Sequence, residues 1–114
     1  MLAKKYRITE NEFKRFARRA KYQRNDIFLV RYANNHQAYS QFAVVVSTKV
    51  SKLATVRNRL RRVVKAWIKE KYADIPKGYY IAIYINKIFT DTEKQTKRDI
   101  LFRIFGKIEY GGAR

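Results

Sequence analysis

The chain has 114 residues, of which 27 are Lys or Arg and 9 are Asp or Glu, so its formal net charge is +18. This length predicts a single domain. The absence of Cys excludes disulfide scaffolds, Cys-ligated zinc, iron–sulfur clusters and thiol catalysis. No apolar run approaches the ~18 residues of a membrane span, and the N-terminal stretch MLAKKYRITE lacks the apolar core of a signal peptide. We therefore expect a soluble cytoplasmic protein.

The charge balance predicts a polyanionic partner, because so strong an excess of one sign opposes compaction through self-repulsion. The chain is too apolar and aromatic for a disordered basic tail, since 46% of its residues are hydrophobic and 15% are aromatic. Nucleic acid is the leading candidate partner. A membrane surface fits less well, because the charge is not confined to one amphipathic helix. A basic protein without any such partner is the third alternative.

The first predicted element is a short basic helix over about residues 10–20. Thr9 and Glu12 have the spacing of a capping box at a helix N-terminus, and Ile8 and Phe13 have that of a hydrophobic staple. Apolar residues then recur at helical spacing while basic residues fill the other faces.

Two strands are predicted next, over residues 27–33 and 39–47, because both stretches are rich in β-branched and aromatic residues. Residues 34–36 (Asn-Asn-His) are typical of a turn, since Asn tolerates positive φ and hydrogen-bonds to its own backbone. Two strands joined in this way predict a hairpin.

The second half of the chain predicts a long helix over residues 54–72, a strand over 79–85 and a final helix. The long helix has one apolar stripe, formed by Val56, Leu60, Val63, Val64, Trp67 and Ile68. The strand alternates, so its isoleucines face one side while Tyr80 and Tyr84 face the other. Thr90 and Glu93 repeat the capping-box spacing before the final helix, and Gly106 is its expected stop.

These elements predict an α+β fold with a mostly antiparallel sheet and helices covering one sheet face. We expect residues 1–114 to form a single RNA-binding domain with flexible ends at 1–7 and 109–114.

The residues offer no constellation for catalysis by the protein itself. The nine acidic residues are scattered, and no D-x-D or E-x-x-H pattern indicates a cage for a divalent metal. The only His, His36, falls in the predicted turn, and no G-x-S-x-G or phosphate-binding Gly-rich loop is present. We therefore expect no catalytic residue in the protein and leave metal ligands unassigned.

Positive charge is concentrated between Lys49 and Lys71, where Glu70 is the only acid. Arg suits RNA because its planar guanidinium binds phosphates in a bidentate manner and stacks on bases. Asn58 can donate to and accept from a ribose 2′-hydroxyl. A solvated helix face is the alternative interpretation.

The aromatic residues divide into two groups. Most of the Phe side chains are expected in the core, whereas Tyr80 and Tyr84 line a second surface. Aromatic rings beside Lys and Arg form a stacking platform for single-stranded nucleic acid.

The stretch VSTKVSKLATVRNRLRRVVKAW, from Val46 to Trp67, resembles the protein subunit of bacterial ribonuclease P. The family pattern is V-[SA]-x-K, a short spacer, and then R-N-R-[IL]-[KR]-R on a basic helix. The matching residues are Val46, Ser47, Lys49, Ala54, Arg57, Asn58, Arg59, Leu60, Arg61 and Arg62. The resemblance extends over roughly residues 5–108.

This resemblance implies an αβββαβα sandwich with a left-handed βαβ crossover, which has one strand more than the residue pattern predicts. It implies an endoribonuclease subunit, in which the protein helps a large catalytic RNA to remove 5′ leaders from precursor tRNA by hydrolysis. The chemistry then resides in the RNA, with magnesium ions held mainly by RNA. The implied partners are ribonuclease P RNA and precursor tRNA, with no membrane and no obligate protein partner.

The resemblance also implies two groups of binding residues. The group expected to dock on the catalytic RNA is Arg57, Asn58, Arg59, Arg61, Arg62 and Lys65. The group expected to bind the leader, in a cleft between the first helix and the sheet and in the adjoining loops, is Phe13, Phe16, Lys49, Lys52, Tyr80, Tyr84 and Lys87. The chain departs from the family pattern at Ala17, where a second aromatic is common. The adjacent Phe16 is either its substitute or a core residue. The chain also departs at residues 50–53, which lack the usual Gly. A basic residue often ends the family's last strand, and here the candidate for it is Lys87, shifted to follow Ile85 and Asn86.

Three other functions remain open from the sequence. A ribosomal or general RNA-binding protein would share the charge but have no processing role. A self-sufficient metal-dependent nuclease would need a carboxylate cluster. DNA binding is compatible with the charge, although no helix-turn-helix spacing is present.

Overall fold

The computed structural model describes residues 3–16 and 18–108. Its helices and strands are α1 (Glu10–Phe16), β1 (Lys21–Arg24), β2 (Phe28–Asn34), β3 (Gln41–Val46), α2 (Ala54–Lys71), β4 (Tyr79–Ile85) and α3 (Lys94–Lys107). Short 3-10 turns lie at Lys4–Tyr6, Tyr72–Asp74 and Asp91–Glu93. The element order is the αβββαβα order that the resemblance implies.

The four strands form one sheet in the order β1-β2-β4-β3. β2 pairs antiparallel with both β1 and β4, whereas β3 pairs parallel with β4. The predicted α+β class with mostly antiparallel pairing is therefore confirmed. α2 connects the parallel neighbours β3 and β4, so the expected βαβ crossover is present, and its left-handed sense stays an expectation from the resemblance.

The predicted hairpin of residues 27–33 and 39–47 is wrong, because β4 lies between β2 and β3. Ile81, Ala82 and Ile83 of β4 are all 0% exposed, although they alternate between the two faces of the sheet. A strand that is apolar on both faces is favoured in the centre of a sheet. The turn after β2 does form: His36 has a φ of 59°, and its N–H donates to Asn34 Oδ1 at 2.7 Å.

β1 is the strand that the residue pattern missed. Its sequence, KYQR, has no apolar alternation, its side chains are mostly exposed, and its one strand partner is β2. An edge strand can be polar in this way. The helix ends also differ from expectation: α1 stops at Phe16, and α3 continues through Gly106 to Lys107.

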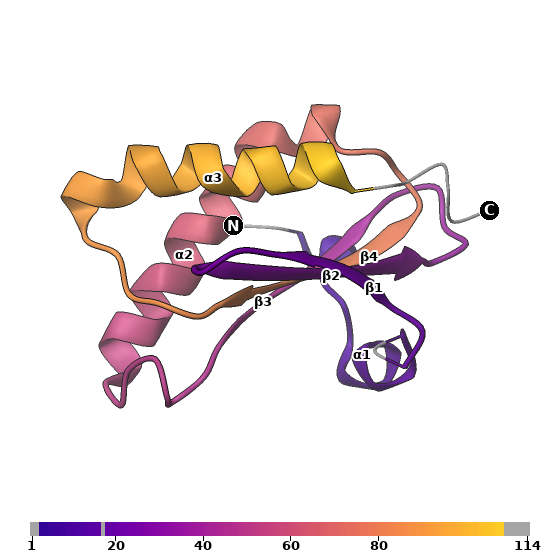
Figure 1. The fold of residues 1–114 in the computed structure, drawn as a ribbon. Coiled ribbons are helices and arrows are strands. Elements are labelled where there is room, and N and C mark those ends of the chain that lie inside the picture. The colour runs from indigo at the N-terminus through magenta and orange to yellow at the C-terminus, as the bar shows by residue number, and fades with distance from the viewer. Residues whose placement is uncertain (1–2, 17, 109–114) are drawn as a thin grey trace.

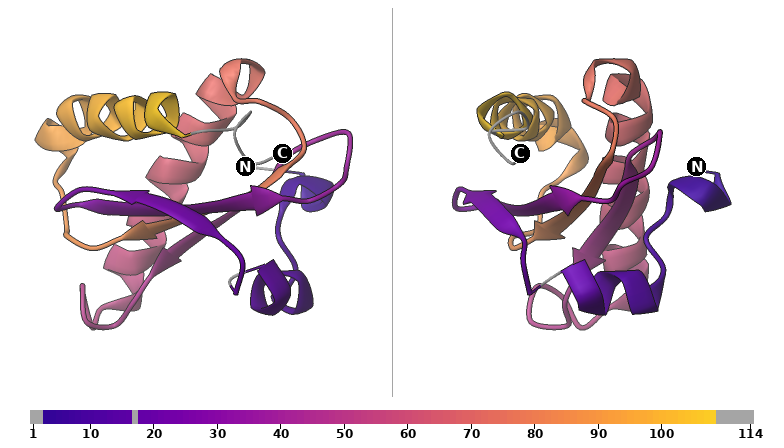
Figure 2. Two further views of the ribbon diagram at one scale, coloured as in Figure 1. Left: turned by 45° about the vertical axis from the view of Figure 1, so that its right-hand side comes forward. Right: turned by 90° about the vertical axis from the view of Figure 1, so that its right-hand side faces the viewer.

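The two long helices cover one face of the sheet, and α1 lies against the other face (Figure 1). α2 and α3 cross each other on their face, as the two views in Figure 2 show. The core between them and the sheet includes Phe28, Val30, Phe42, Leu60, Trp67, Ile81, Ile83, Phe89 and Leu101. Trp67 stacks on Phe89 with ring centroids 5.4 Å apart. Both predicted capping boxes form, the second one between Thr90 and Glu93.

Glu12 fixes the short helix α1 to the sheet. Its Oε1 accepts the Thr9 N–H at 2.9 Å, and its own N–H donates to Thr9 Oγ1 at 3.2 Å, which completes the first capping box. The carboxylate also accepts from Gln41 Nε2 of β3 at 3.3 Å and from the Tyr80 hydroxyl of β4 at 3.5 Å. Burial raises the pKa of Glu12, but the hydrogen bonds from Thr9, Gln41 and Tyr80 outweigh burial and leave that pKa below its ordinary value.

Residues 3–8 of the N-terminal segment lie along the edge of the sheet, and the flexibility expected for residues 1–7 stays a prediction. Arg7 forms a parallel bridge with Phe42 at the start of β3, and the Ile8 N–H donates to the Phe42 carbonyl at 3.0 Å. Tyr6 packs against the core and holds the segment down. Residues 1–2 and 109–114, the remainder of the predicted flexible ends, and Ala17 lie outside the described residues.

Replacing Glu12 with Ala should lower the free energy of unfolding by about 1–2 kcal/mol, because the capping box and two cross-element hydrogen bonds are lost together. Urea unfolding followed by circular dichroism measures the change. Glu10→Ala is the matched control: it removes the same charge from the same turn, where the carboxylate pairs with Lys14 at 3.8 Å in solvent. The control should change stability by less than about 0.5 kcal/mol. Equal effects of the two substitutions would contradict the anchoring role of Glu12.

Candidate RNA interface

α2 separates a buried stripe from a basic flank. Leu60, Val64, Trp67 and Ile68 are buried against the sheet, as their spacing predicts. The side chains of Asn58, Arg61, Arg62 and Lys65, here called the α2 basic surface, line an open hollow of about 380 Å³ together with Ala66. Arg61 donates to Asn58 Oδ1 within this surface. Among the described residues, no carboxylate forms an ion pair with its three cations.

The pKa of Lys65 reflects the surroundings of this surface, where no carboxylate among the described residues pairs with the cations. Burial lowers the pKa of Lys65, and the positive charges of Arg7 and Arg61 lower it further. Like charges held together in this way repel one another. A phosphate among them would replace that repulsion with charge-assisted hydrogen bonds.

The side chains of Arg57 and Arg59 bind other parts of the protein and do not line this hollow. The guanidinium of Arg57 donates to the Ser51 carbonyl at 2.8 Å, in the loop that precedes α2. The guanidinium of Arg59 donates to the Phe89 carbonyl at 2.6 Å and pairs with Asp91 at 3.3 Å. Both cations of the R-N-R triplet are therefore engaged in protein contacts. Arg61 and Arg62, which follow in the longer motif, line the α2 basic surface.

A second candidate surface lies on the opposite face of the sheet. Phe13 and Phe16 from α1 meet Tyr80 and Tyr84 from β4, and we call these four residues the aromatic patch. Phe16 stacks on Tyr80 with centroids 5.2 Å apart, and the Phe13 ring lies edge-on to Tyr84 at 6.2 Å. Phe16 is 0% exposed, whereas Phe13 and Tyr84 keep part of their surface in solvent. Phe16 thus forms the buried base of the patch, and the rings of Phe13 and Tyr84 are partly exposed.

The phenols of the patch carry no negative charge near neutral pH. Burial raises the pKa of Tyr84 above its ordinary value, against the smaller opposing effect of Arg31. Burial and the Glu12 carboxylate raise the pKa of Tyr80. The phenols therefore add no negative charge to that of the Glu12 carboxylate beside Tyr80.

Arg31 is the residue that sequence reasoning missed on this face. Its guanidinium lies over the Tyr84 ring, 5.6 Å from the centroid. The strand pairing explains the contact, because Arg31 pairs with Ala82 and therefore points to the same face as Tyr84. Strict alternation along residues 27–33 predicts that Arg31 points to the other face of the sheet from the buried Phe28, Val30 and Tyr32. Tyr22 of the unpredicted strand β1 pairs with Arg31 and shares this face.

Lys49, Lys52 and Lys87 follow the carboxyl ends of neighbouring strands. Lys49 and Lys52 lie in the loop after β3, and Lys87 lies in the loop after β4. Because the two strands are parallel and Val46 pairs with Ile85, both loops leave the same end of the sheet. All three lysines are exposed. Of the two patch residues on β4, Tyr84 lies nearer to this end of the strand.

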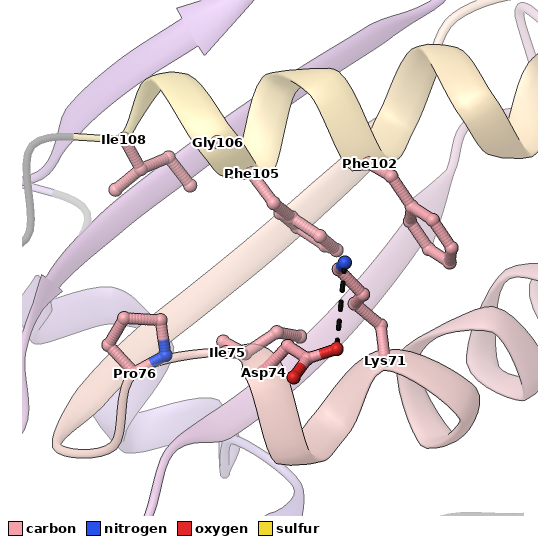
Figure 3. A pocket seen from close by; sticks show the side chains of 8 residues that line it. All are labelled: Lys71, Asp74, Ile75, Pro76, Phe102, Phe105, Gly106 and Ile108. Carbon is pink, nitrogen blue, oxygen red and sulfur yellow. Dashed lines mark ion pairs between the residues drawn. The ribbon is translucent and has the colours of Figure 1, made fainter.

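Another hollow, of about 320 Å³, lies between the C-terminal parts of α2 and α3 (Figure 3). Its lining residues are Lys71, Asp74, Ile75, Pro76, Phe102, Phe105, Gly106 and Ile108. The Lys71 ammonium pairs with Asp74 at 3.7 Å, so the two charges of this hollow balance each other. None of the predicted binding residues lines this hollow. Its positive charge is paired with a carboxylate, whereas the cations of the α2 basic surface have no such partner among the described residues.

The described residues include no group of three or more His, Cys, Asp or Glu side chains that could hold a metal ion. No helix in the described part of the chain has both the length and the apolar character needed to cross a membrane.

Comparison with known proteins places the chain among ribonuclease P proteins. The family model described as Ribonuclease P matches residues 2–109. The chain is 34% identical over 107 residues to the ribonuclease P protein component of Synechocystis sp., with 90% of this chain and 86% of the relative covered. It is 32% identical over 89 residues to the ribonuclease P protein component of Thermotoga maritima, with 75% of each covered.

Solved structures agree with the sequence relatives. The RNase P protein from Thermotoga maritima matches with a TM-score of 0.76 and 26% identity, over 90% of this chain and 97% of that chain. The RNase P protein from Staphylococcus aureus has a TM-score of 0.72 at 20% identity, over 89% of this chain and 93% of that chain, and so supports the fold. A family match over nearly the whole length, joined to the basic flank of α2 and the shared αβββαβα order, shows that this chain belongs to the Ribonuclease P family.

Proposed function

We propose that this chain is the protein component of a cytoplasmic ribonuclease P ribonucleoprotein, an endoribonuclease that removes 5′ leaders from precursor tRNA. The observation that carries the proposal is the α2 basic surface, on a member of the Ribonuclease P family. Around its one hollow lie three cations that have no acidic partner among residues 3–16 and 18–108. The relatives at 34% and 32% identity are named ribonuclease P protein component. Nothing in the described residues favours a general RNA-binding protein without a processing role.

The α2 basic surface is the proposed docking site for the catalytic RNA. Arg61, Arg62 and Lys65 would each neutralise phosphates and release bound counterions, which is the main source of affinity in such interfaces. Asn58 would bind a ribose or phosphate oxygen. Arg57 and Arg59 belong to the proposed interface as the residues that hold α2 to the preceding loop and to residues 89–91.

The aromatic patch is the proposed binding site for the single-stranded leader. Phe13 and Tyr84 would stack on bases, which is sequence-tolerant because every base has a π-face. Phe16 and Tyr80 would hold these rings in place. Lys49, Lys52 and Lys87 would then bind phosphates of the strand where it leaves the patch.

The chemistry in this proposal belongs to the RNA, with magnesium ions held mainly by RNA and substrate. The protein would act by electrostatics, since 18 net positive charges reduce the repulsion between two polyanions, the catalytic RNA and the precursor tRNA. The whole chain, residues 1–114, would serve as one RNA-binding domain. No step is assigned to a metal held by the protein.

Arg61→Ala should weaken binding to a ribonuclease P RNA transcript more than Arg59→Ala does. Arg61 lines the hollow and has no acidic partner in the described part of the chain, whereas Arg59 is bound to Phe89 and Asp91. We expect a loss of about tenfold in affinity for Arg61→Ala, the size of one charge-assisted contact. Arg59→Ala should instead lower the thermal midpoint. Titration at fixed salt and a melting curve for each variant measure both effects, and the reverse ranking in the RNA titration would refute the proposed surface.

Tyr84→Leu should reduce the preference of the holoenzyme for precursor tRNA over mature tRNA by about tenfold, because one stacked base contributes about 1–3 kcal/mol. Tyr84→Phe is the matched control, since it keeps the ring and removes only the hydroxyl. Competition binding with the two tRNAs measures the preference. If the Leu and Phe variants behave alike, ring stacking by the aromatic patch does not contribute to leader binding.

A further inference from the structure

The N-terminal segment is tied to the edge of the sheet next to α2. Arg7 bridges Phe42 at the outer edge of β3, the Ile8 N–H donates to the Phe42 carbonyl at 3.0 Å, and the Arg7 carbonyl accepts from Gln41 Nε2 at 3.4 Å. β3 is an edge strand, and α2 packs against it. Residues 7 and 8 therefore extend the sheet beyond β3, the strand against which α2 packs.

Tyr6 anchors this segment. Its ring meets Tyr39 at 5.7 Å and Tyr72 at 5.1 Å between centroids, so it lies between the loop before β3 and the turn after α2. Tyr6 is partly buried and contacts the main core. The side chain next to it, Arg7, is exposed and, within residues 3–16 and 18–108, has no ion pair.

Arg7 and α2 adjoin the same strand, since Arg7 bridges Phe42 of β3 and α2 packs against β3. Burial lowers the pKa of Lys65 most, and the positive charges of Arg7 and Arg61 lower it further, which agrees with this placement. Arg7 comes from a segment distant in sequence from α2, and Tyr6 keeps it there. Three cations from two elements, with no carboxylate paired to any of them in the described residues, form a site suited to a polyanion.

We propose that the N-terminal segment 3–8 is part of the RNA-docking surface: Tyr6 anchors it, and Arg7 binds a backbone phosphate of ribonuclease P RNA beside Arg61 and Lys65. This inference rests on the proposed function of the α2 basic surface. Arg7 is a binding residue, and Tyr6 is a positioning residue that acts through it.

Binding of a ribonuclease P RNA transcript to the full-length protein, measured over roughly 50–200 mM salt, tests the proposal. Arg7→Ala should weaken binding by about fivefold at low salt and reduce the log–log salt slope by about 0.7–0.9, the contribution of one phosphate contact. Arg7→Lys should retain most of the slope, because the charge remains. Lys14→Ala is the charge-matched control: its side chain is 73% exposed on α1, on the other face of the sheet, and its loss should change neither quantity.

Tyr6→Ala should weaken RNA binding as Arg7→Ala does, although the charge remains in the chain. The double variant Tyr6→Ala/Arg7→Ala should be no weaker than either single variant, because both remove the same contact. A Tyr6→Ala protein that is folded and binds RNA as the unsubstituted protein does would overturn the anchoring role. If it does not fold, the Arg7 variants alone decide the proposal.

Arg61→Ala in the same assay separates this inference from the proposed function. If Arg61→Ala weakens binding while Arg7→Ala behaves like Lys14→Ala, the N-terminal segment is not part of the interface and the α2 basic surface stands. If Arg61→Ala also behaves like Lys14→Ala, the α2 surface itself is refuted, and the role of Arg7 with it.

Discussion

The central position of β4 is the constraint on which the rest of the structure depends. It pairs with β2 on one side and with β3 on the other, and its isoleucines form the middle of the core under α2 and α3. The alternate residues, Tyr80 and Tyr84, then face the opposite side and meet α1. One strand thus separates the packed core from the aromatic patch. The parallel pairing with β3 also brings the lysine-bearing loops to one end of the sheet.

The positive charge is arranged in two different ways around this frame. Some cations are paired within the protein, as Arg59 is with Asp91 and Arg98 is with Glu70 at 2.8 Å. Others, on the α2 basic surface and at Arg7, have no acidic partner among the described residues. Paired cations hold the elements together. Cations without a partner raise the energy of the free protein and lower it again when a polyanion binds, which is how the fold is suited to RNA.

Local features were predictable from the sequence, because their determinants lie a few residues apart. Both capping boxes, the long helix over 54–72 and the alternation of 79–85 formed as predicted. Strand pairing was not predictable, because the choice between β2–β3 and β2–β4 pairing depends on residues far apart in the chain. β1 was missed because a polar edge strand has no apolar alternation.

The candidate sites were predictable to a similar degree. The resemblance named Arg61, Arg62 and Lys65 among the docking residues, and the structure places them around one hollow. Neither the resemblance nor the spacing in α2 indicated that Arg59 binds Phe89 and Asp91 across the fold. Arg31 and Arg7 were missed for the same reason, since each is defined by a neighbour on another element. The sequence predicted only a helix-capping role for Glu12. Its hydrogen bonds with Gln41 and Tyr80 join residues far apart in the chain, so the local sequence pattern does not predict them.

Reconstitution tests the central claim most directly. The purified protein is mixed with a ribonuclease P RNA and a precursor tRNA at a magnesium concentration where the RNA alone is nearly inactive, and release of the 5′ leader is followed. The account predicts release only when protein and RNA are both present. Release by the protein alone would contradict it in favour of a self-sufficient nuclease, and tight RNA binding without release under any condition would contradict it in favour of a general RNA-binding protein.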